Sequence, residues 1–535
     1  MKYSTPLLSS ILIIALSCSN QLAKAQAPSI AWQKTAGGSN DEDGYNMIKT
    51  TDGNYVVFGT TNSVDGDFSI NRGDYDAFAI KFDGDGNFIW SKTYGGSSYD
   101  DFTDMLETGD GGFLAAGTTA SNDGDVHGNH GGDDDIWIAS LNASGDLIWS
   151  KCFGGSGDDL DYQSSSGFIK TSDNNFMFAA LSNSSDGDVP ENKGDYDAWL
   201  VKINKHGKII FSKTYGGSAS DNLVSVVETS HGKYVIGGST FSTDGDVIGN
   251  HGGAGDYMLM RLNKKGDIKW SRCYGGSGSD FFHDAVHGPG STVVFGGSTN
   301  SSDGNVTNYH GGYSDSWVVK IKSQNGDIIW ANCFGDTRTE ACFGLIKTSD
   351  GYVSVSAVDS GGYCCFETWD AQAIKMDENG NELWSKVFGG TDYDLVNTGV
   401  ETNDGGLMLN CVTSSTDGDI TNYHGGPEDG WLVKLNPDGE RISFQNETTS
   451  VSELKNYPNP FSTSTTISFS LSQPQKVSLK IFDVNGRLVL TLADKIFAAG
   501  ENEIVWTAKD ENAGIYFLQL QSVEFSKTEK LSVTK

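Results

Sequence analysis

The stretch "NHGGDDDIWIASLNASGDLIWSKCFGGSGDD", from Asn129 to Asp159, decides the fold because it recurs along the chain. Near-copies are "NKGDYDAWLVKINKHGKIIFSKTYGGSASD" from Asn192 and "NYHGGYSDSWVVKIKSQNGDIIWANCFGDTRTE" from Asn308. Each copy contains an aromatic anchor, and successive anchors are about 59 residues apart, a period typical of repeat architectures. The anchors are Trp32, Trp90, Trp149, Phe211, Trp270, Trp330, Trp384 and Phe444. They delimit seven units.

The pattern of each unit predicts four short strands, which are rich in β-branched and aromatic residues. Turns such as the Asp-Gly hairpin "TTDGNY" at Thr50 separate these strands. The units are longer than solenoid rungs, and nothing resembles an end cap. The pattern therefore predicts an all-β fold, a seven-bladed β-propeller of four-stranded blades. The anchor strand occurs once more than the others. We therefore expect the strand around Trp32 to lie near the strand around Phe444, or to compete with it for one position.

The chain has 535 residues and a formal net charge of −33, with 70 acidic residues against 37 Lys and Arg. This balance argues against binding to nucleic acid or anionic lipid, which needs basic patches. It suits an exported protein and leaves carboxylates free for hard cations. The longest apolar run, at residues 7–16, is too short to span a bilayer, so we expect no transmembrane segment.

The N-terminus has the pattern of an export signal. Lys2 is the basic flank, the apolar run follows, and Ala23-Lys24-Ala25 is a small-residue cleavage site. Residues 1–25 are therefore predicted to be a signal peptide, cleaved between Ala25 and Gln26. Lipid attachment at Cys18 is the alternative, although Ala15 stands where such sites usually carry Leu.

Seven cysteines remain after the signal is removed. Cys152, Cys273 and Cys333 share one repeat position, and equivalent positions lie far apart, so we expect buried free thiols. A second group allows a local disulfide. Its members are Cys342, Cys364, Cys365 and Cys411.

The composition changes after about Phe444, because acidic and basic residues balance in the tail and glycine becomes rare. The predicted organisation is a propeller at 26–444, a polar linker at 445–453 and a C-terminal domain at 454–535. The tail has its own strands, such as "TTISFSL" and "KVSLKIFDV", which predict a small Ig-like β-sandwich.

Four segments of the tail resemble the type A sorting domain of the bacterial type IX secretion system. They are "NYPNPF" (Asn456–Phe461), "VSLKIFDVNGRLV" (Val477–Val489), "AGIYFLQL" (Ala513–Leu520) and the terminal "KLSVTK". The first contains the motif residues Tyr457, Pro458, Asn459, Pro460 and Phe461. The resemblance implies a Bacteroidetes-type source and passage through the periplasm and across the outer membrane by the type IX machinery. The domain is then removed, and the protein is secreted or attached to lipopolysaccharide on the outer-membrane surface. The repeats also resemble secreted Gly- and Asp-rich propeller repeats of such bacteria.

Two carboxylates recur in every unit. The first ring follows "GGS" and comprises Glu42, Asp100, Asp159, Asp221, Asp280, Glu340 and Asp394. The second precedes the strand aromatic and comprises Asp76, Asp135, Asp197, Asp256, Asp315, Asp370 and Asp429. An active site needs unlike residues that converge once, whereas every blade needs its turns fixed. We therefore expect these carboxylates to accept backbone N–H groups of nearby turns.

A long loop with the pattern S-x-D-G-D occurs in most units. Its acids are Asp65, Asp67, Asp123, Asp125, Asp186, Asp188, Asp244, Asp246, Asp417 and Asp419, with Asp303 and Asn305 in the fifth unit. Two carboxylates across a glycine can share Ca²⁺ when other oxygens complete the shell, so calcium is a candidate cofactor. The spacing differs from an EF-hand, and a solvated Asx-turn is the alternative that we favour.

Histidines precede "GG" in the same loop, at His130, His251, His310 and His424. Zinc would require ligands around one ion, but these residues belong to four different units, and Arg72 and Lys193 occupy the position in two others. His, Arg and Lys share a hydrogen-bond donor at this position. We therefore expect each of these side chains to contact a neighbouring carboxylate.

The sixth unit departs from the pattern, because it lacks D-G-D and carries Tyr363 and Trp369. A site on a pseudo-symmetric scaffold must break the symmetry, so these two residues are candidate ligand contacts. A degenerate blade stapled by a disulfide is the alternative.

No nucleophile elbow, phosphate loop or zinc-protease motif is present. We therefore favour a non-catalytic surface or secreted module that binds a glycan or protein, with no catalytic residue assigned. The alternative is an extracellular polysaccharide hydrolase with a carboxylate pair in the propeller channel.

Overall fold

The computed structural model describes residues 26–160, 166–230, 232–359, 369–421, 423–438, 451–471, 474–484, 487–509, 511–522 and 526–534. The chain forms two compact units, Met1–Gly439 and Glu440–Lys535. The described residues contain strands and no helix, as the sequence predicts.

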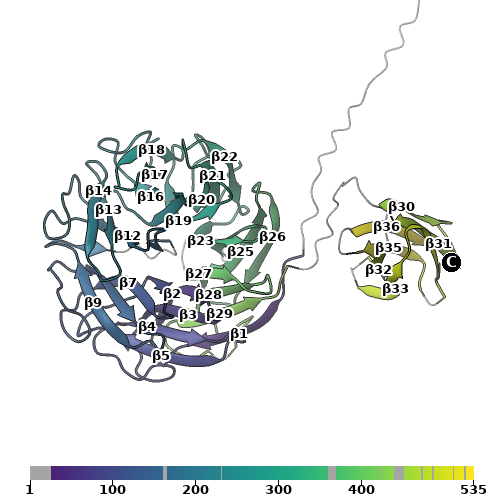
Figure 1. The fold of residues 1–535 in the computed structure, drawn as a ribbon, viewed down its shortest axis with the longest axis horizontal. Coiled ribbons are helices and arrows are strands. Elements are labelled where there is room, and N and C mark those ends of the chain that lie inside the picture. Colours follow the sequence, from purple (N-terminus) through teal and green to yellow (C-terminus); the bar gives the residue numbers. More distant parts are fainter. Residues whose placement is uncertain are drawn as a thin grey trace, which may run out of the picture. The chain divides into compact units, whose positions relative to one another are not determined.

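The described residues of the first unit form seven antiparallel sheets (Figure 1). The first contains β2 (Glu42–Lys49), β3 (Tyr55–Thr61), β4 (Asp76–Phe82) and β5 (Phe88–Tyr94). The second contains β6 (Asp104–Glu107), β7 (Phe113–Thr119), β8 (Asp135–Leu141) and β9 (Leu147–Phe153). The third contains β10 (Asp159–Leu160), β11 (Phe168–Lys170), β12 (Phe176–Ser182), β13 (Asp197–Ile203) and β14 (Ile209–Tyr215). The fourth contains β15 (Ser225–Ser230), β16 (Lys233–Thr240), β17 (Asp256–Leu262) and β18 (Ile268–Tyr274).

The remaining three sheets complete the ring. The fifth contains β19 (Asp280–Gly288), β20 (Thr292–Thr299), β21 (Asp315–Lys322) and β22 (Ile328–Phe334). The sixth contains β23 (Glu340–Thr348), β24 (Gly351–Asp359), β25 (Trp369–Asp377) and β26 (Glu382–Phe388). The seventh contains β27 (Asp394–Glu401), β28 (Leu407–Thr413), β29 (Asp429–Leu435) and β1 (Ile30–Ala36). Successive innermost strands touch in a closed cycle, from β2 through β6, β11, β15, β19, β23 and β27 back to β2, so the sheets form a β-propeller around a central channel.

The N-terminal strand closes the ring. β1 pairs antiparallel with β29, so the strand containing Trp32 is the outer strand of the seventh sheet. Of the two positions that the sequence left open, this strand takes the one that completes the last sheet. Phe444 lies outside the described residues.

The anchor aromatics join neighbouring sheets. Gly86, in the turn between β4 and β5, has a φ of 75°, and a β-carbon there would lie 2.5 Å from the Trp32 ring. The same contact joins Gly145 to Trp90 at 2.9 Å and Gly380 to Trp330 at 2.7 Å. The turn therefore needs glycine for its left-handed backbone and for the indole of the preceding sheet.

The apolar core lies between facing sheets. Phe58 of β3, Phe113 of β7 and Trp137 of β8 are fully buried in one cluster. The free thiols Cys152, Cys273, Cys333, Cys342 and Cys411 are also buried, so the local disulfide does not join Cys342 to Cys411. Cys364 and Cys365 lie outside the described residues.

The described residues of the second unit form two sheets. One has β30 (Val451–Tyr457), β31 (Ser464–Leu471) and β34 (Gly500–Thr507), and the other has β32 (Gln475–Phe482), β33 (Leu488–Phe497), β35 (Gly514–Gln521) and β36 (Ser526–Val533). Trp506, Phe461 and Phe469 belong to its own buried core. β30 begins at Val451, inside the stretch that the sequence assigns to the linker.

Candidate functional site

The propeller has two chemically different ends. Both hairpins of each sheet lie at the turn end. The long D-G-D loops and the crossovers between sheets lie at the other end, which we call the loop end. Because every innermost strand runs the same way along the channel, its first residues face the loop end and its last residues face the turn end.

Carboxylates of both rings accept backbone N–H groups at the loop end, as predicted. The first ring holds the crossovers between sheets, and the second ring holds the long loop of its own sheet. Asp370 follows residues outside the described ranges, so its part in the second ring stays a prediction. Asp100 accepts the backbone N–H of Gly96 at 2.7 Å and hydroxyls of Thr119 and Ser121. Asp76 accepts the backbone N–H of Arg72 at 2.8 Å. The same backbone bond recurs in the first ring at Glu42, Asp159, Asp221, Asp280, Glu340 and Asp394, and in the second at Asp135, Asp197, Asp256, Asp315 and Asp429.

Carboxylates of the two rings meet at five described junctions between sheets, at Gly37, Gly95, Gly154, Gly216 and Gly275. A β-carbon on Gly95 would lie 2.6 Å from Asp100 Oδ2 and 2.9 Å from Asp76 Oδ1, so both groups converge on this glycine. Burial raises the pKa of Asp76 to about 6 and that of Asp100 to about 7. Asp76 Oδ1 is buried without a hydrogen-bond partner among the described residues.

Carboxylates of the D-G-D loops accept hydrogen bonds from the backbone of the same crossovers. Asp123 Oδ1 accepts the backbone N–H of Ser97 at 2.7 Å, and Asp125 Oδ2 accepts that of Gly95 at 3.3 Å. Equivalent backbone bonds involve Asp65, Asp67, Asp186, Asp244, Asp246, Asp303, Asp417 and Asp419. The backbone N–H of Asp188 donates to the Gly154 carbonyl. Across the described ranges, no three His, Cys, Asp or Glu residues are grouped to hold a metal, and calcium at these loops stays a prediction.

The loop histidines contact the second carboxylate ring, as expected. His130 Nδ1 lies 2.7 Å from Asp135 Oδ2, and His251 Nδ1 lies 2.7 Å from Asp256 Oδ2. His310 repeats the contact at 2.9 Å, and His424 approaches Asp429 at 3.6 Å. Each histidine thus serves its own sheet.

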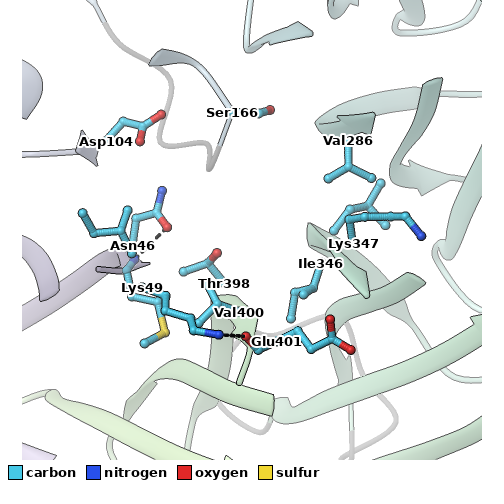
Figure 2. A pocket seen from close by; sticks show the side chains of 14 residues that line it. Asn46, Lys49, Asp104, Ser166, Val286, Ile346, Lys347, Thr398, Val400 and Glu401 are labelled. Atoms are coloured by element: carbon cyan, nitrogen blue, oxygen red, sulfur yellow. Dashed lines mark hydrogen bonds between the residues drawn. The ribbon is translucent and has the colours of Figure 1, made fainter. Parts of the chain in front are cut away.

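The turn end of the channel holds a cavity of about 370 Å³ (Figure 2). Lining residues include Asn46, Asp104, Ser166, Val286, Ile346 and Thr398. The charged groups around it already have partners. Lys49 Nζ donates to the Glu401 carbonyl at 3.1 Å, the Glu401 carboxylate accepts the Ser349 hydroxyl at 2.7 Å, and Asp104 accepts the Phe168 N–H at 2.9 Å.

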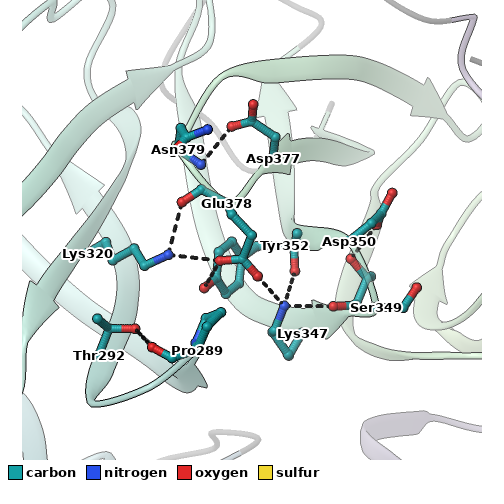
Figure 3. Close-up of polar contacts among 12 residues, drawn as sticks. Pro289, Thr292, Lys320, Lys347, Ser349, Asp350, Tyr352, Asp377, Glu378 and Asn379 are labelled. Carbon is teal, nitrogen blue, oxygen red and sulfur yellow. Dashed lines mark hydrogen bonds and ion pairs between the residues drawn. The ribbon is translucent and has the colours of Figure 1, made fainter. Parts of the chain in front are cut away.

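A polar cluster lies between the fifth and sixth sheets (Figure 3). Glu378 accepts Lys320 Nζ at 2.8 Å, Lys347 Nζ at 2.7 Å and the Tyr352 hydroxyl at 2.7 Å. In other sheets the equivalent lysine bonds an Asp of its own hairpin, as Lys81 does with Asp52 at 2.8 Å. The fifth hairpin carries Pro-Gly there, so Glu378 of the next sheet takes the role.

Unlike residues replace the repeat pattern where the innermost strands face the loop end. β2, β19, β23 and β27 each contain a register shift there, a bulge that re-aims side chains. The residues at this point are Tyr45, His283, Phe343 and Asn397, all half-buried. We call this region the channel mouth.

One side of the channel mouth is aromatic. The Phe343 ring lies 5.4 Å from His283 and 6.2 Å from Trp369, measured between centroids. Tyr393 and Leu395 pack on the same cluster. Burial lowers the pKa of His283 to about 4, so its ring is neutral at neutral pH. Trp369 is only 7% exposed and packs with Phe343, and its contact with a ligand stays a prediction. Tyr363 lies outside the described residues.

The other side of the channel mouth is acidic. Asp43 follows the first-ring acid of β2, and Asp101 occupies the equivalent place before β6. Burial, reinforced by Glu428, Asp41 and Asp101, raises the pKa of Asp43 to about 8. Burial raises the pKa of Asp101 to about 6.

A chain of hydrogen bonds links the acidic side to Tyr45. The Tyr45 and Tyr99 hydroxyls are 3.1 Å apart, and the Tyr99 hydroxyl donates to Asp101 Oδ2 at 3.2 Å. Asp101 Oδ1 accepts the backbone N–H of Thr118 at 2.6 Å and its hydroxyl at 3.1 Å. Nearby, the Tyr75 hydroxyl donates to Asp41 at 2.9 Å.

Sequence reasoning missed the channel mouth because it aligned the units by what they share. The signal lies at the positions one and three residues after the first-ring acid. Asp43 and Tyr45 occupy them in the first unit, whereas Asn222 and Val224 do so in the fourth. Pseudo-symmetry is lost there, and only the ring brings these positions together.

The predicted sorting motif lies against β36 in the second unit. Asn459 Nδ2 donates to the Lys530 carbonyl at 2.8 Å, and its Oδ1 accepts the Ser532 N–H at 2.9 Å. Phe461 is buried beside Trp506, whereas Tyr457, ahead of Pro458 and Pro460, is 82% exposed.

Residues 455–534 match the family described as the secretion system C-terminal sorting domain, as the sequence predicts. This domain marks the chain for export through the type IX secretion system, to the cell surface or the medium. Within the described residues, no helix has the length and apolar character needed to cross a membrane.

Solved structures similar to the chain include PorZ, a surface component of the type IX secretion system of Porphyromonas gingivalis. The match has 12% identity and a TM-score of 0.40, and covers 95% of this chain but only 61% of PorZ. A fungal alcohol oxidase in complex with copper has 10% identity and a TM-score of 0.42, covering 95% of this chain and 100% of the oxidase. A Trypanosoma rangeli sialidase has 8% identity and a TM-score of 0.35, covering 90% and 83%. No curated protein sequence matches the chain.

Proposed function

We propose that the chain is an exported propeller, surface-attached or released, that binds a glycan or protein ligand at the channel mouth without catalysis. The single observation behind this proposal is the loss of pseudo-symmetry there. The recurring carboxylates accept backbone N–H groups of crossovers or long loops, as Asp100 and Asp76 do. Tyr45, His283, Phe343 and Asn397, in contrast, differ from sheet to sheet. Unlike side chains that meet once are what a specific site requires.

The chemistry of the channel mouth fits a saccharide best. Phe343 presents an aromatic ring that can cover the apolar face of a sugar. Across the channel, Asp43 and Tyr45 present oxygen atoms that can bond sugar hydroxyls. A pyranose ring has both kinds of surface, so it suits a mouth that is aromatic on one side and acidic on the other.

The test is a glycan array probed with residues 26–535, the chain without its predicted signal peptide. Tyr45→Phe and Phe343→Ala should each weaken binding of any glycan that the wild type retains, because each removes one side of the site. Tyr313→Ala is the control, since Tyr313 is 69% exposed in a long loop outside the channel mouth. Unchanged binding by both site variants would contradict the proposal.

A second candidate function is polysaccharide hydrolysis by a carboxylate pair, favoured by Asp43 and Asp101. The raised pKa of Asp43, about 8, keeps it protonated at neutral pH, as a general acid requires. Asp101, with a pKa of about 6, is then ionised. Release of new reducing ends by the wild type, abolished in Asp43→Asn, would replace the binding proposal with this one.

A further inference from the structure

We infer that Tyr99 and Asp101 are positioning residues that turn the Tyr45 hydroxyl into a hydrogen-bond acceptor, so that the channel mouth selects ligand groups that donate. The inference rests on the proposed function, because it assigns the ligand class of the same site. It follows from the direction of the hydrogen bonds from Asp101 to Tyr45.

Asp101 sets the direction in which the hydrogen bonds between Tyr45, Tyr99 and Asp101 run. An ionised carboxylate only accepts hydrogen bonds, and Asp101 Oδ1 is already occupied by the N–H and hydroxyl of Thr118, at 2.6 and 3.1 Å. Its Oδ2, 3.2 Å from the Tyr99 oxygen, must therefore accept the one hydroxyl hydrogen of Tyr99. Asp101 is ionised above about pH 6, so this holds at neutral and alkaline pH.

The hydrogen bond between Tyr99 and Asp101 determines which role the Tyr45 hydroxyl can take toward a ligand. With its hydrogen committed to Asp101, Tyr99 can only accept from Tyr45, 3.1 Å away. Tyr45 thereby commits its own hydrogen and keeps its lone pairs for a ligand. A hydroxyl or an ammonium group satisfies those lone pairs, and a ligand carboxylate does not. The ligand class is thus a neutral or aminated saccharide.

The chain itself contains the substitution that should reverse this direction. Asn222 in the fourth unit is equivalent to Asp101, and its Oδ1 accepts the backbone N–H of Ser239 as Asp101 Oδ1 accepts that of Thr118. Asp101→Asn can therefore keep the backbone bond, which leaves Nδ2 toward Tyr99. The amide would donate to Tyr99, Tyr99 would donate to Tyr45, and Tyr45 would present its hydrogen to the ligand.

The experiment measures calorimetric affinities of the full-length mature protein at pH 8 for three probes. At this pH chitosan oligosaccharide offers neutral amine and hydroxyl donors, cello-oligosaccharide offers hydroxyls, and oligogalacturonate offers carboxylate acceptors. We expect the wild type to prefer the two donors. Asp101→Asn should move the ratio of chitosan to oligogalacturonate affinity toward oligogalacturonate by about tenfold or more, the effect of a misdirected hydrogen bond.

Tyr99→Phe separates direction from charge, because it breaks the chain without removing a carboxylate. It should lower the preference for donors, whereas a purely structural Tyr99 would leave the ratio unchanged. Tyr196→Phe is the matched control. Its hydroxyl donates to Asp158 at 3.0 Å in the third sheet, so its loss should leave the ratio at the wild-type value.

The outcomes distinguish the inference from the proposed function. If Tyr45→Phe weakens binding but Tyr99→Phe keeps the wild-type ratio, the site stands and the directional inference is wrong. If Tyr45→Phe and Phe343→Ala both bind all probes like the wild type, the site itself is wrong. Failure of the wild type to bind any of the three probes overturns the saccharide assignment and the inference with it.

Discussion

At the residue scale, the buried carboxyl groups at the junctions between sheets make the stability of the propeller depend on pH. Asp76 and Asp100 are buried together around Gly95, and burial raises both pKa values above the 3.8 of an exposed aspartate. The native state therefore binds protons that the unfolded chain releases. The stabilisation from these protons is fully present below about pH 4 and is lost as the pH rises through the native values, about 6 and 7.

We expect the free energy of unfolding of the propeller to fall between about pH 4 and pH 8, because the same pair recurs around the ring. Glu378 and Asp404 act in the opposite sense. Hydrogen bonds from Lys320 and Lys347 hold the pKa of Glu378 at about 2, and those from Thr402, the Gly406 backbone and Lys434 hold that of Asp404 at about 2. Their contribution is therefore lost only in stronger acid. Urea unfolding followed by tryptophan fluorescence across this range measures the dependence. A flat profile, or a rise toward pH 8, would contradict it.

Asp76→Asn is the informative variant at this scale. Asp76 Oδ1 is buried without a partner among the described residues, and an amide nitrogen in its place could donate to Asp100 across Gly95. We expect Asp76→Asn to raise stability at pH 8 by about 1 kcal/mol and to flatten the pH profile. Asp52→Asn, at an exposed hairpin, is the control that should not flatten the profile in this range.

At the element scale, β1 is the strand that closes the ring. It is joined to the propeller by pairing with β29 and by the Trp32 ring on Gly86. Trp32→Ala should lower the free energy of unfolding by about 2–4 kcal/mol, since it removes a large aromatic at the closure. Ile148→Ala is the control on another outer strand, because Ile148 is 61% exposed and its loss should be nearly neutral. Denaturation midpoints compare the two, and equal midpoints would show that closure does not depend on Trp32.

The D-G-D loop is the second element with a clear expectation. Its carboxylates hold crossover N–H groups, as Asp244 holds Ser218 at 2.7 Å. We expect the melting temperature to be the same in calcium and in chelator, because these oxygens are already engaged. Asp244→Ala should still destabilise by about 1–3 kcal/mol through the orphaned N–H. A melting temperature that rises with calcium would instead establish metal binding, since a ligand of the native state stabilises it.

At the scale of the whole molecule, the chain combines a propeller with a domain that has its own core and matches the sorting family. Deleting residues 451–535 should leave a folded propeller that remains in the periplasm, because the deletion removes the export signal and no propeller core. Fusing these residues to an unrelated exported protein should carry that protein to the surface of a host with the type IX system. Fractionation and circular dichroism measure both. A truncated protein that reaches the surface, or fails to fold, would contradict the assignment.

The sequence by itself determined the propeller, because four-strand units with a recurring anchor can bury their apolar faces only against neighbouring copies. It also determined the role of recurring residues. A carboxylate such as Asp100, present in every unit, must serve what every unit needs, and it holds a crossover. The sorting domain was equally readable, since its motif is local in the chain.

Only the tertiary structure decided the closure and the candidate site. Pairing between β1 and β29 joins opposite ends of the propeller, and the sequence left two positions open for that strand. Tyr45, Tyr99 and Asp101 come from two units, and His283 and Phe343 from two more, so no local pattern unites them. The physical reason is that each unit carries the residues of the shared scaffold in its own sequence. A site, in contrast, arises where closure of the ring brings together residues that differ between units.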